Sequence, residues 1–392
     1  MSNKCAHVGR CGGCTHYEIS YEEELRLKEA DLRETLGEYG AQLEGLRPSP
    51  VVEGYRNKFE LAFGDDGGKG ETRKLALGMR KKRSFYEVAT TENCVLMPDD
   101  FKKIAAYTMQ FFRESGEAVY HRKAHTGVLR HLLLRRGHFT GEILVLLSTT
   151  SALEANLAPF VQGLRDLPLR GVIVGILHAK NDGVADAIKN ECVTTLWGRD
   201  FYREKLLGLT FHVSAFSFFQ TNSVGAEVLY EIVREMASGD GQLCNLAFDL
   251  YCGTGTIAQI ISPLFEKVMG IELIPEAIEA AQKNAQLNGI ENCIFHAHDI
   301  TKIATQKKTP LSGAPNVIIV DPPRDGLSPR ALAKVAELAP AHIIYVACKP
   351  ASLVRDLPTL VNAGYTPVRF TAADLFPRTP HIEAICLLTN TQ

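Results

Sequence analysis

The stretch DLYCGTGT, residues 249–256, decides how the second half of this chain is read. The surrounding residues LAFDLYCG predict a buried strand that ends in a glycine turn, and TGTIAQIISPLF predicts the helix that follows. Gly253 and Gly255 allow the backbone to turn tightly and to approach a ligand. No Gly-Lys-Ser/Thr follows, so this is not a phosphate-binding P-loop, and Ala258 replaces the third glycine of a dinucleotide fingerprint. The turn predicts a ligand site but does not identify the ligand.

Strand-like and helix-like segments alternate on both sides of this turn. After about residue 215 the predicted strands include KVMGIEL, CIFHAHD, NVIIVDPPR, HIIYVACKP and IEAICLLT, with helices such as AEVLYEIVREMA and SPRALAKVAELA between them. This alternation predicts an α/β fold with a doubly wound, mainly parallel sheet. Ligands of such sheets bind beyond the carboxyl ends of the strands. Asp249, Glu272, Asp299, Asp321 and Cys348 all stand at predicted strand ends.

The first half of the chain has a different pattern. Residues 17–40 show helical spacing, with Gly40 as the expected C-cap. Between about 50 and 200, short apolar runs separated by glycine-rich punctuation predict a β-rich region, with helices at 100–117 and 151–165. We therefore expect an N-terminal segment at 1–45, a central β-rich domain at 46–210 and an α/β domain at 211–392.

Composition limits the kind of partner. The 392 residues carry a formal net charge of −2, so any polyanion site has to be a local patch. Such a patch is predicted by Arg56 and Lys58 and by basic runs at 79–83, 121–125 and 129–138. The N-terminus has no apolar signal region and no stretch approaches 18 apolar residues. We expect a cytoplasmic protein that does not bind membranes.

Cysteines cluster at the N-terminus. Cys5, Cys11 and Cys14 are followed much later by Cys94, and the chain has no secretory signal, so metal ligation is favoured over disulfides. Four thiolates suit tetrahedral zinc or an iron–sulfur cubane, and the spacing alone does not separate these. Free, unliganded thiols are the remaining alternative.

Several further motifs follow in order: YRNKFELAF, FSFFQTNS, FDLYCGTGTIA, DPPRDGL, ACKP and FPRTPHIEAI. Together with the cysteine set, they resemble the RNA uracil-C5 methyltransferases, the family that makes 5-methyluridine in transfer RNA and 23S ribosomal RNA. The resemblance covers most of the chain. It implies a class I, Rossmann-like methyltransferase domain, S-adenosylmethionine as methyl donor and a [4Fe-4S] cluster on Cys5, Cys11, Cys14 and Cys94. It also implies cofactor-binding roles for Gln220, Tyr251, Thr256, Glu272, Asp299 and Asp321, and catalytic roles for Cys348 and Glu383.

The implied chemistry explains these residue types. Carbon 5 of uracil is a weak nucleophile, and a thiolate that adds to carbon 6 turns the ring into an enolate able to attack a sulfonium methyl group. Cys348 is the candidate nucleophile, and Glu383 is the candidate base for the proton on carbon 5. We expect Lys349 or Arg324 to lower the pKa of the thiol if either lies close.

The chain departs from the family pattern in two ways. Ala347-Cys348-Lys349-Pro350 replaces the usual Ser-Cys-Asn-Pro, which removes two polar groups near the thiol. The cysteine set begins at residue 5, so the chain resembles the shorter members that lack an N-terminal RNA-binding β-barrel. We therefore expect a monomer that methylates carbon 5 of a uridine in 23S rRNA. The alternatives are the same chemistry on tRNA, a non-catalytic RNA-binding or assembly factor, and a zinc-containing methyltransferase with another substrate.

Overall fold

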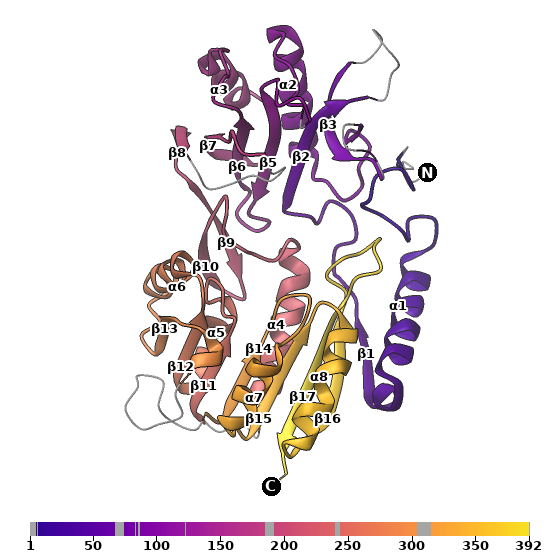
Figure 1. The fold of residues 1–392 in the computed structure, drawn as a ribbon, viewed down its shortest axis with the longest axis vertical. Helices are drawn as coiled ribbons and strands as arrows, with labels where there is room; N and C mark the ends of the chain where they lie inside the picture. Colours follow the sequence, from indigo (N-terminus) through magenta and orange to yellow (C-terminus); the bar gives the residue numbers. More distant parts are fainter. Residues whose placement is uncertain are drawn as a thin grey trace. The chain divides into compact units, whose positions relative to one another are not determined.

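The computed structural model describes the chain apart from residues 1–4, 6, 67–73, 83, 85–86, 122, 185–191, 240–243, 304–314 and 392. Two compact units make up this described part (Figure 1). Unit 1 comprises Met1–Glu18, Val51–Lys205 and His212–Ser223, and unit 2 comprises Ile19–Pro50, Leu206–Phe211 and Val224–Gln392. These bounds differ from the domains expected from the sequence, because the N-terminal cysteines group with unit 1 and the helix that follows them groups with unit 2.

The strands of unit 2 form a sheet in the order β1-β16-β17-β15-β14-β11-β12-β13. Chain order runs outward from β11 through β12 to β13 and then returns to β14 on the other side of β11. Neighbouring strands are parallel except that β17 is antiparallel to both of its neighbours. The predicted doubly wound, mainly parallel sheet is confirmed, with its switch point between β11 and β14. The strands are β1 (Leu43–Arg47), β11 (Cys244–Leu250), β12 (Phe265–Glu272), β13 (Cys293–Ala297), β14 (Val317–Val320), β15 (His342–Ala347), β16 (Tyr365–Ala373) and β17 (Glu383–Asn390).

Helices α1 (Tyr21–Leu36), α7 (Pro329–Glu337) and α8 (Pro350–Asn362) share an apolar core with one face of this sheet. Leu32 and Leu353 from the helices pack in the same cluster as Phe248 and Tyr345 from the strands. The remaining helical segments are α4 (Ser223–Ala237), α5 (Thr256–Ile261), α6 (Pro275–Leu287) and short 3₁₀ turns at Gly37–Gln42, Ser262–Leu264 and Ile300–Lys302. None of the helices in the described part of the chain combines the length and apolarity needed to cross a membrane.

Helix α1 begins and ends at recognisable caps. The hydroxyl of Ser20 accepts a hydrogen bond from the Glu23 amide at 3.1 Å. The helix ends at Gly37, whose φ of 58° suits glycine, so the predicted cap at Gly40 is wrong. Gly40 instead lies in the following 3₁₀ turn, where a Cβ atom would approach the carbonyl oxygen of Arg33 to 2.6 Å.

Unit 1 is built on a sheet in the order β4-β3-β2-β5-β6-β7-β8, antiparallel except for the β6–β7 pair. Helix α2 (Asp99–Ser115) packs Phe101 edge-on against Phe59 of the sheet, and Phe112 of the same helix contacts Phe160 of α3 (Leu157–Arg165). The strands are β2 (Lys58–Asp65), β3 (Leu75–Arg80), β4 (Val88–Thr90), β5 (Leu129–Arg136), β6 (Glu142–Thr149), β7 (Val172–Lys180) and β8 (Val193–Gly198), followed by a separate hairpin of β9 (Phe201–Leu206) and β10 (Leu209–Ser214).

The basic runs of unit 1 are only partly surface features. Arg130 is buried and donates to the carbonyl oxygens of Asn181 and Gly183 at 2.9 and 2.8 Å. Arg135 is buried and donates to the carbonyl oxygen of Ser214 at 2.5 Å. These two arginines hold backbone segments together, which corrects the expectation that the whole run 129–138 faces a polyanion. Arg83 and Arg122 lie outside the described residues.

Candidate active site

The glycine turn after β11 has the tight backbone that its glycines predict, and the residue before it, Tyr251, also has a positive φ. Tyr251 has a φ of 64°, and Gly253 and Gly255 have φ values of 53° and 76°. A Cβ atom on Gly255 would lie 2.6 Å from a ring carbon of Phe295, so glycine is required there by space as well as by conformation. Thr256 then begins α5 and is buried. The turn therefore holds backbone amides close to the carboxyl end of the sheet.

Carboxylates surround this turn. Asp249 is fully buried, and its Oδ2 accepts a hydrogen bond from the Ala258 amide at 2.9 Å, while its Oδ1 is buried without a partner among the described residues. Glu272 ends β12 and accepts from the amides of Leu273 and Gly253 at 2.7 and 3.3 Å. Both side chains thus stand at neighbouring strand ends, as predicted.

Asp299 lies past the end of β13 and caps the next 3₁₀ turn. Its Oδ1 accepts from the amide and the hydroxyl of Thr301 at 2.9 and 2.7 Å. These hydrogen bonds, with a smaller effect of Lys302, lower the pKa of Asp299 below its usual value. The carboxylate therefore stays ionised beside the neighbouring strand end that carries Glu272.

The loop after β14 places Asp321 and is itself held by α8. The amide of Leu327 donates to Asp356 at 2.8 Å, and the hydroxyl of Tyr345 donates to the same carboxylate oxygen at 2.7 Å. A Cβ atom on Gly326 would meet the side chains of Arg355 and Asp356 at 2.7 and 2.8 Å. The Asp-Pro-Pro-Arg segment is therefore fixed at its far end by a buried carboxylate.

Cys348 and Glu383 are brought together by the sheet. Ala347 in β15 is the register partner of Ala384 in antiparallel β17. Cys348 directly follows Ala347 and Glu383 directly precedes Ala384, so both residues extend the same pair of strands at the same end. Glu383 is 3% exposed, and the thiol is partly exposed. Val320, the residue before Asp321, is the register partner of Tyr345, so Asp321 also follows at this end.

This group of acids is strongly perturbed. Burial raises the pKa of Asp249 to about 8 and that of Asp321 to about 7. Burial and the neighbouring Asp321 raise the pKa of Glu383 well above its usual value. Perturbed acids grouped at strand ends are typical of an active site.

Tyr230, in α4, is part of the same site and was missed by the sequence reasoning. Burial and then Asp321, Glu383 and Asp249 raise the pKa of its phenol well above the usual value. Phe248 faces the core shared with α1, α7 and α8, so the adjacent Asp249 points to the other face of the sheet, where Tyr230 reaches it. Nothing in the helical pattern of residues 226–237 distinguishes this tyrosine from a core residue.

The electrostatics of Cys348 differ from expectation. Its pKa is raised to about 11 by burial and by the carboxylates of Glu383 and Asp321, although Arg324 acts in the opposite direction. The positive neighbour that lowers the pKa of the thiol is Arg324. Arg324 thus lowers the pKa as expected, but burial and two carboxylates outweigh it. The free thiol is protonated at neutral pH.

Gln220 lies in unit 1, whereas the other predicted cofactor-binding residues lie in unit 2. Its backbone is anchored by Asn57, whose side-chain amide donates to the carbonyl oxygen of Gln220 and to the hydroxyl of Ser223, both at 2.9 Å. Ser223 in turn donates to the buried carboxylate of Glu204. The segment that carries Gln220 is therefore held rigidly within its own unit.

The four predicted metal-ligating cysteines all lie in unit 1. Cys14 is buried in its apolar core, and Cys94 is partly buried beside it. Burial raises the pKa of Cys94, amides of Leu96 and Met97 lower it, and the charges of Cys5 and Cys11 raise it. The donor type fits a thiolate-bound metal. However, the described part of the chain holds no group of three or more ligating side chains arranged to bind a metal ion.

Comparisons with known proteins agree with this geometry. The sequence model of the family described as tRNA (Uracil-5-)-methyltransferase matches residues 203–391. An uncharacterised RNA methyltransferase of Caldanaerobacter subterraneus is 42% identical to this chain over 99% of its length and 85% of the relative. Another from Porphyromonas gingivalis is 34% identical over 98% and 86%. The crystal structure of Pyrococcus abyssi tRNA (uracil-54, C5)-methyltransferase with S-adenosyl-L-homocysteine superposes with a TM-score of 0.78 and 26% identity, over 97% of this chain and 86% of that one.

Proposed function

This chain belongs to the RNA uracil-5-methyltransferase family, and we propose that it methylates carbon 5 of a uridine through a covalent bond between Cys348 and carbon 6. The methyl donor is S-adenosylmethionine. The observation that carries the proposal is the register of β15 and β17, which places the Cys348 thiol and the buried Glu383 carboxylate at the same end of one strand pair.

The reaction follows from these two groups. The partly exposed Cys348 thiol first releases its proton to water. The thiolate then adds to carbon 6, and the electron pair of the double bond moves onto carbon 5 and the adjoining carbonyl. Carbon 5 then attacks the sulfonium methyl group, and S-adenosylhomocysteine leaves. The Glu383 carboxylate takes the proton from carbon 5, the double bond reforms, and the thiolate is released. Arg324 favours the thiolate, as does the amino end of α8, which starts two residues after Cys348.

The cofactor assignment is part of the same proposal. The carboxylate of Glu272 accepts hydrogen bonds from the ribose hydroxyls, and the carboxylate of Asp299 accepts a hydrogen bond from the exocyclic amine of adenine. Tyr251 and Thr256 line the glycine turn, and Asp321 faces the reacting end. The cofactor-binding role of Gln220 rests on the family resemblance alone, because Gln220 belongs to unit 1 and the other residues belong to unit 2.

We further propose that Cys5, Cys11, Cys14 and Cys94 hold a [4Fe-4S] cluster. The four thiols of one unit and the amides directed at Cys94 support it. The methylation steps above do not pass through this group, so its role is to hold the N-terminal segment. A brown preparation that loses its iron on Cys11→Ala replacement supports the assignment, and a colourless preparation that contains zinc contradicts it.

The RNA substrate is proposed to be 23S rRNA, with tRNA as the second candidate in view of the tRNA enzyme of Pyrococcus abyssi. Phe218, with 71% of its surface exposed, is the most exposed aromatic side chain of FSFFQTNS and can stack on an unpaired base, whereas Phe216 is partly buried and Phe219 is buried. A cytoplasmic, monomeric protein is part of this proposal. Mapping 5-methyluridine in both RNAs from cells with and without the gene decides between the substrates.

The covalent step has a direct test. RNA transcribed with 5-fluorouridine is incubated with the protein and S-adenosylmethionine, and the mixture is run on a denaturing gel. Because fluorine cannot leave as a cation, the adduct should persist with the wild type and be absent with Cys348→Ala. Glu383→Gln should accumulate an adduct with unmodified RNA. If the wild type forms no adduct, the protein is instead a non-catalytic RNA-binding factor.

A further inference from the structure

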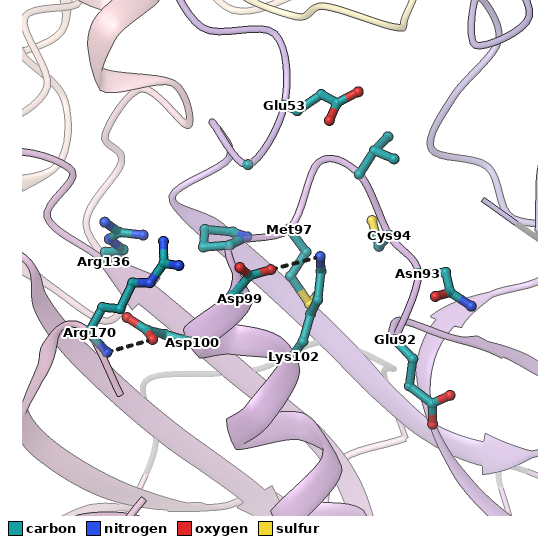
Figure 2. A pocket seen from close by; sticks show the side chains of 13 residues that line it. Glu53, Glu92, Asn93, Cys94, Met97, Asp99, Asp100, Lys102, Arg136 and Arg170 are labelled. Atoms are coloured by element: carbon teal, nitrogen blue, oxygen red, sulfur yellow. Dashed lines mark hydrogen bonds and ion pairs between the residues drawn. The ribbon is translucent and has the colours of Figure 1, made fainter. Parts of the chain in front are cut away.

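A pocket of about 410 Å³ lies within unit 1, at the amino end of α2 (Figure 2). Arg136, from the end of β5, and Arg170, from the segment before β7, line it together with Asp99, Asp100 and Lys102. We call it the arginine pocket. Its wall also includes Cys94, so it adjoins the cysteine group but contains none of the proposed methyl-transfer residues.

Neither arginine of the pocket forms an ion pair with an acid in the described part of the chain. Among the described residues, neither guanidinium group has an ion pair or a side-chain hydrogen bond, and the Nε of Arg136 is buried without a partner. By contrast, Arg199 and Arg203 of the same unit both pair with Glu142. A buried, unpaired guanidinium nitrogen needs an explanation, and a bound anion would supply one.

The neighbouring acids take their hydrogen bonds and ion pairs from other groups, although Arg170, after Lys102, helps to lower the pKa of Asp99. Asp100 is buried, and its two oxygens accept from the amides of Arg170 and Gly171, both at 2.9 Å. Asp99 pairs with Lys102 at 3.1 Å. Asp100 therefore anchors the backbone of Arg170 rather than its guanidinium group.

The pocket has one basic side and one acidic side. Figure 2 shows Arg136 and Arg170 on one side and Glu92, with Asn93, on the other. The exposed carboxylates of Glu53 and Glu92 also line it, so the pocket does not suit a run of phosphates. The pocket suits a ligand with one anionic group at the arginines and a polar, hydrogen-bonding group at the opposite side. One nucleotide of an RNA chain has both, in its phosphate and its base.

We propose that Arg136 and Arg170 bind one backbone phosphate of the RNA substrate, with the attached base toward Asn93 and Glu92. The inference rests on the proposed function for the identity of the anion. It assigns unit 1 a specific contact with RNA apart from the reacting uridine, so it predicts an effect on RNA binding and not on the covalent chemistry.

The test measures the affinity of the whole protein for a labelled oligouridylate at several salt concentrations, without S-adenosylmethionine. Losing one phosphate contact should reduce the slope of log Kd against log salt by about 0.7 for single-stranded RNA. Arg136→Gln/Arg170→Gln and the milder Arg170→Gln, whose side chain is exposed, should both weaken binding, and Arg136→Lys should retain most of it. Arg165→Gln removes one charge from α3 of the same unit and should behave as the wild type.

An oligomer of the same sequence with an uncharged methylphosphonate backbone should bind the wild type and the double variant equally. Wild-type affinity and salt slope in both Arg170→Gln and the double variant would overturn the inference. The 5-fluorouridine adduct of Cys348 is measured on the same preparations. If the adduct forms but the arginine variants bind RNA normally, only the proposed role of the arginine pocket is contradicted. If RNA binding depends on the arginines but no adduct forms, only the proposed covalent reaction is contradicted.

Discussion

The ammonium group of Lys28 in α1 lies 2.9 Å from a carboxylate oxygen of Asp374, 346 residues further along the chain. Lys28 also lies 2.7 Å from Glu24, and the hydroxyl of Tyr21 donates to Asp374 at 2.9 Å. The three charged side chains are buried. Asp374 begins the segment that leads into Glu383, so helix α1 fixes the approach to the proposed base.

Lys28→Met should destabilise the protein strongly. The change leaves the carboxylates of Glu24 and Asp374 buried without their shared cation, and breaking a buried ion pair costs about 3–5 kcal/mol. Chemical unfolding followed by circular dichroism measures this loss. Arg26→Met, on the same helix but at an exposed pair with Glu23, should cost less than about 1 kcal/mol. Equal effects of the two changes would contradict the network's role.

The pKa of Cys348 should move in opposite directions in two variants. The ionised carboxylate of Glu383 disfavours the Cys348 thiolate. Glu383→Gln removes this negative charge, so the pKa of Cys348 should fall below about 11. Arg324→Gln removes a positive charge that favours the thiolate, so the pKa should rise. The rate of alkylation by iodoacetamide against pH reports both, with Cys348→Ala as the blank. Shifts of the same sign in both variants would show that the charges are wrongly assigned.

Gly255→Ala should abolish binding of S-adenosylhomocysteine. The new Cβ atom would lie 2.6 Å from Phe295 and would sit on a backbone with a φ of 76°. Gly253→Ala is the matched control, because its φ is also positive but no atom lies within 4 Å of the added carbon. We expect only the conformational cost of about 1–2 kcal/mol in that variant. Calorimetric binding and thermal melting of both proteins test the difference.

Asp356→Ala should loosen the loop that carries Asp321. Two buried donors, the Leu327 amide and the Tyr345 hydroxyl, would lose their acceptor, at a cost of about 1–3 kcal/mol each. Tyr345→Phe removes one of these hydrogen bonds and should have the smaller effect on unfolding free energy. Adduct formation with 5-fluorouridine RNA should slow in the order of the two destabilisations.

The α/β half was readable from the sequence because its signals are local. Each buried strand from β11 to β15 is an apolar run that stops at a polar residue, and each such stop proved to lie at the same edge of the sheet. β16 was missed because Pro367 and Arg369 interrupt its apolar pattern, although tertiary pairing with β17 holds it as a strand.

The properties of the site that the sequence did not predict are those that depend on which side chains the fold buries. The run 129–138 was expected to contribute to a basic patch, yet β5 is buried along its length except at its last residue, so Arg135 is buried and Arg136 is half-exposed at the arginine pocket. The sequence suggested a cation that lowers the pKa of Cys348, and Arg324 does so, but it could not show that the fold also buries the thiol beside two carboxylates that raise the pKa. Tyr230 is likewise significant only through the acids it meets in space.

The pairing of β1 with β16 also bears on how the protein is made. Leu43 is the register partner of Phe370, and β17, which carries Glu383, lies between β16 and β15. On the ribosome, β1 must wait for β16, more than 300 residues later in the chain, before it gains its strand partner. A nascent chain could fold most of unit 1 but not join the proposed base to its thiol. The proposed active site is therefore complete only when β15 and β17 have both been made and paired.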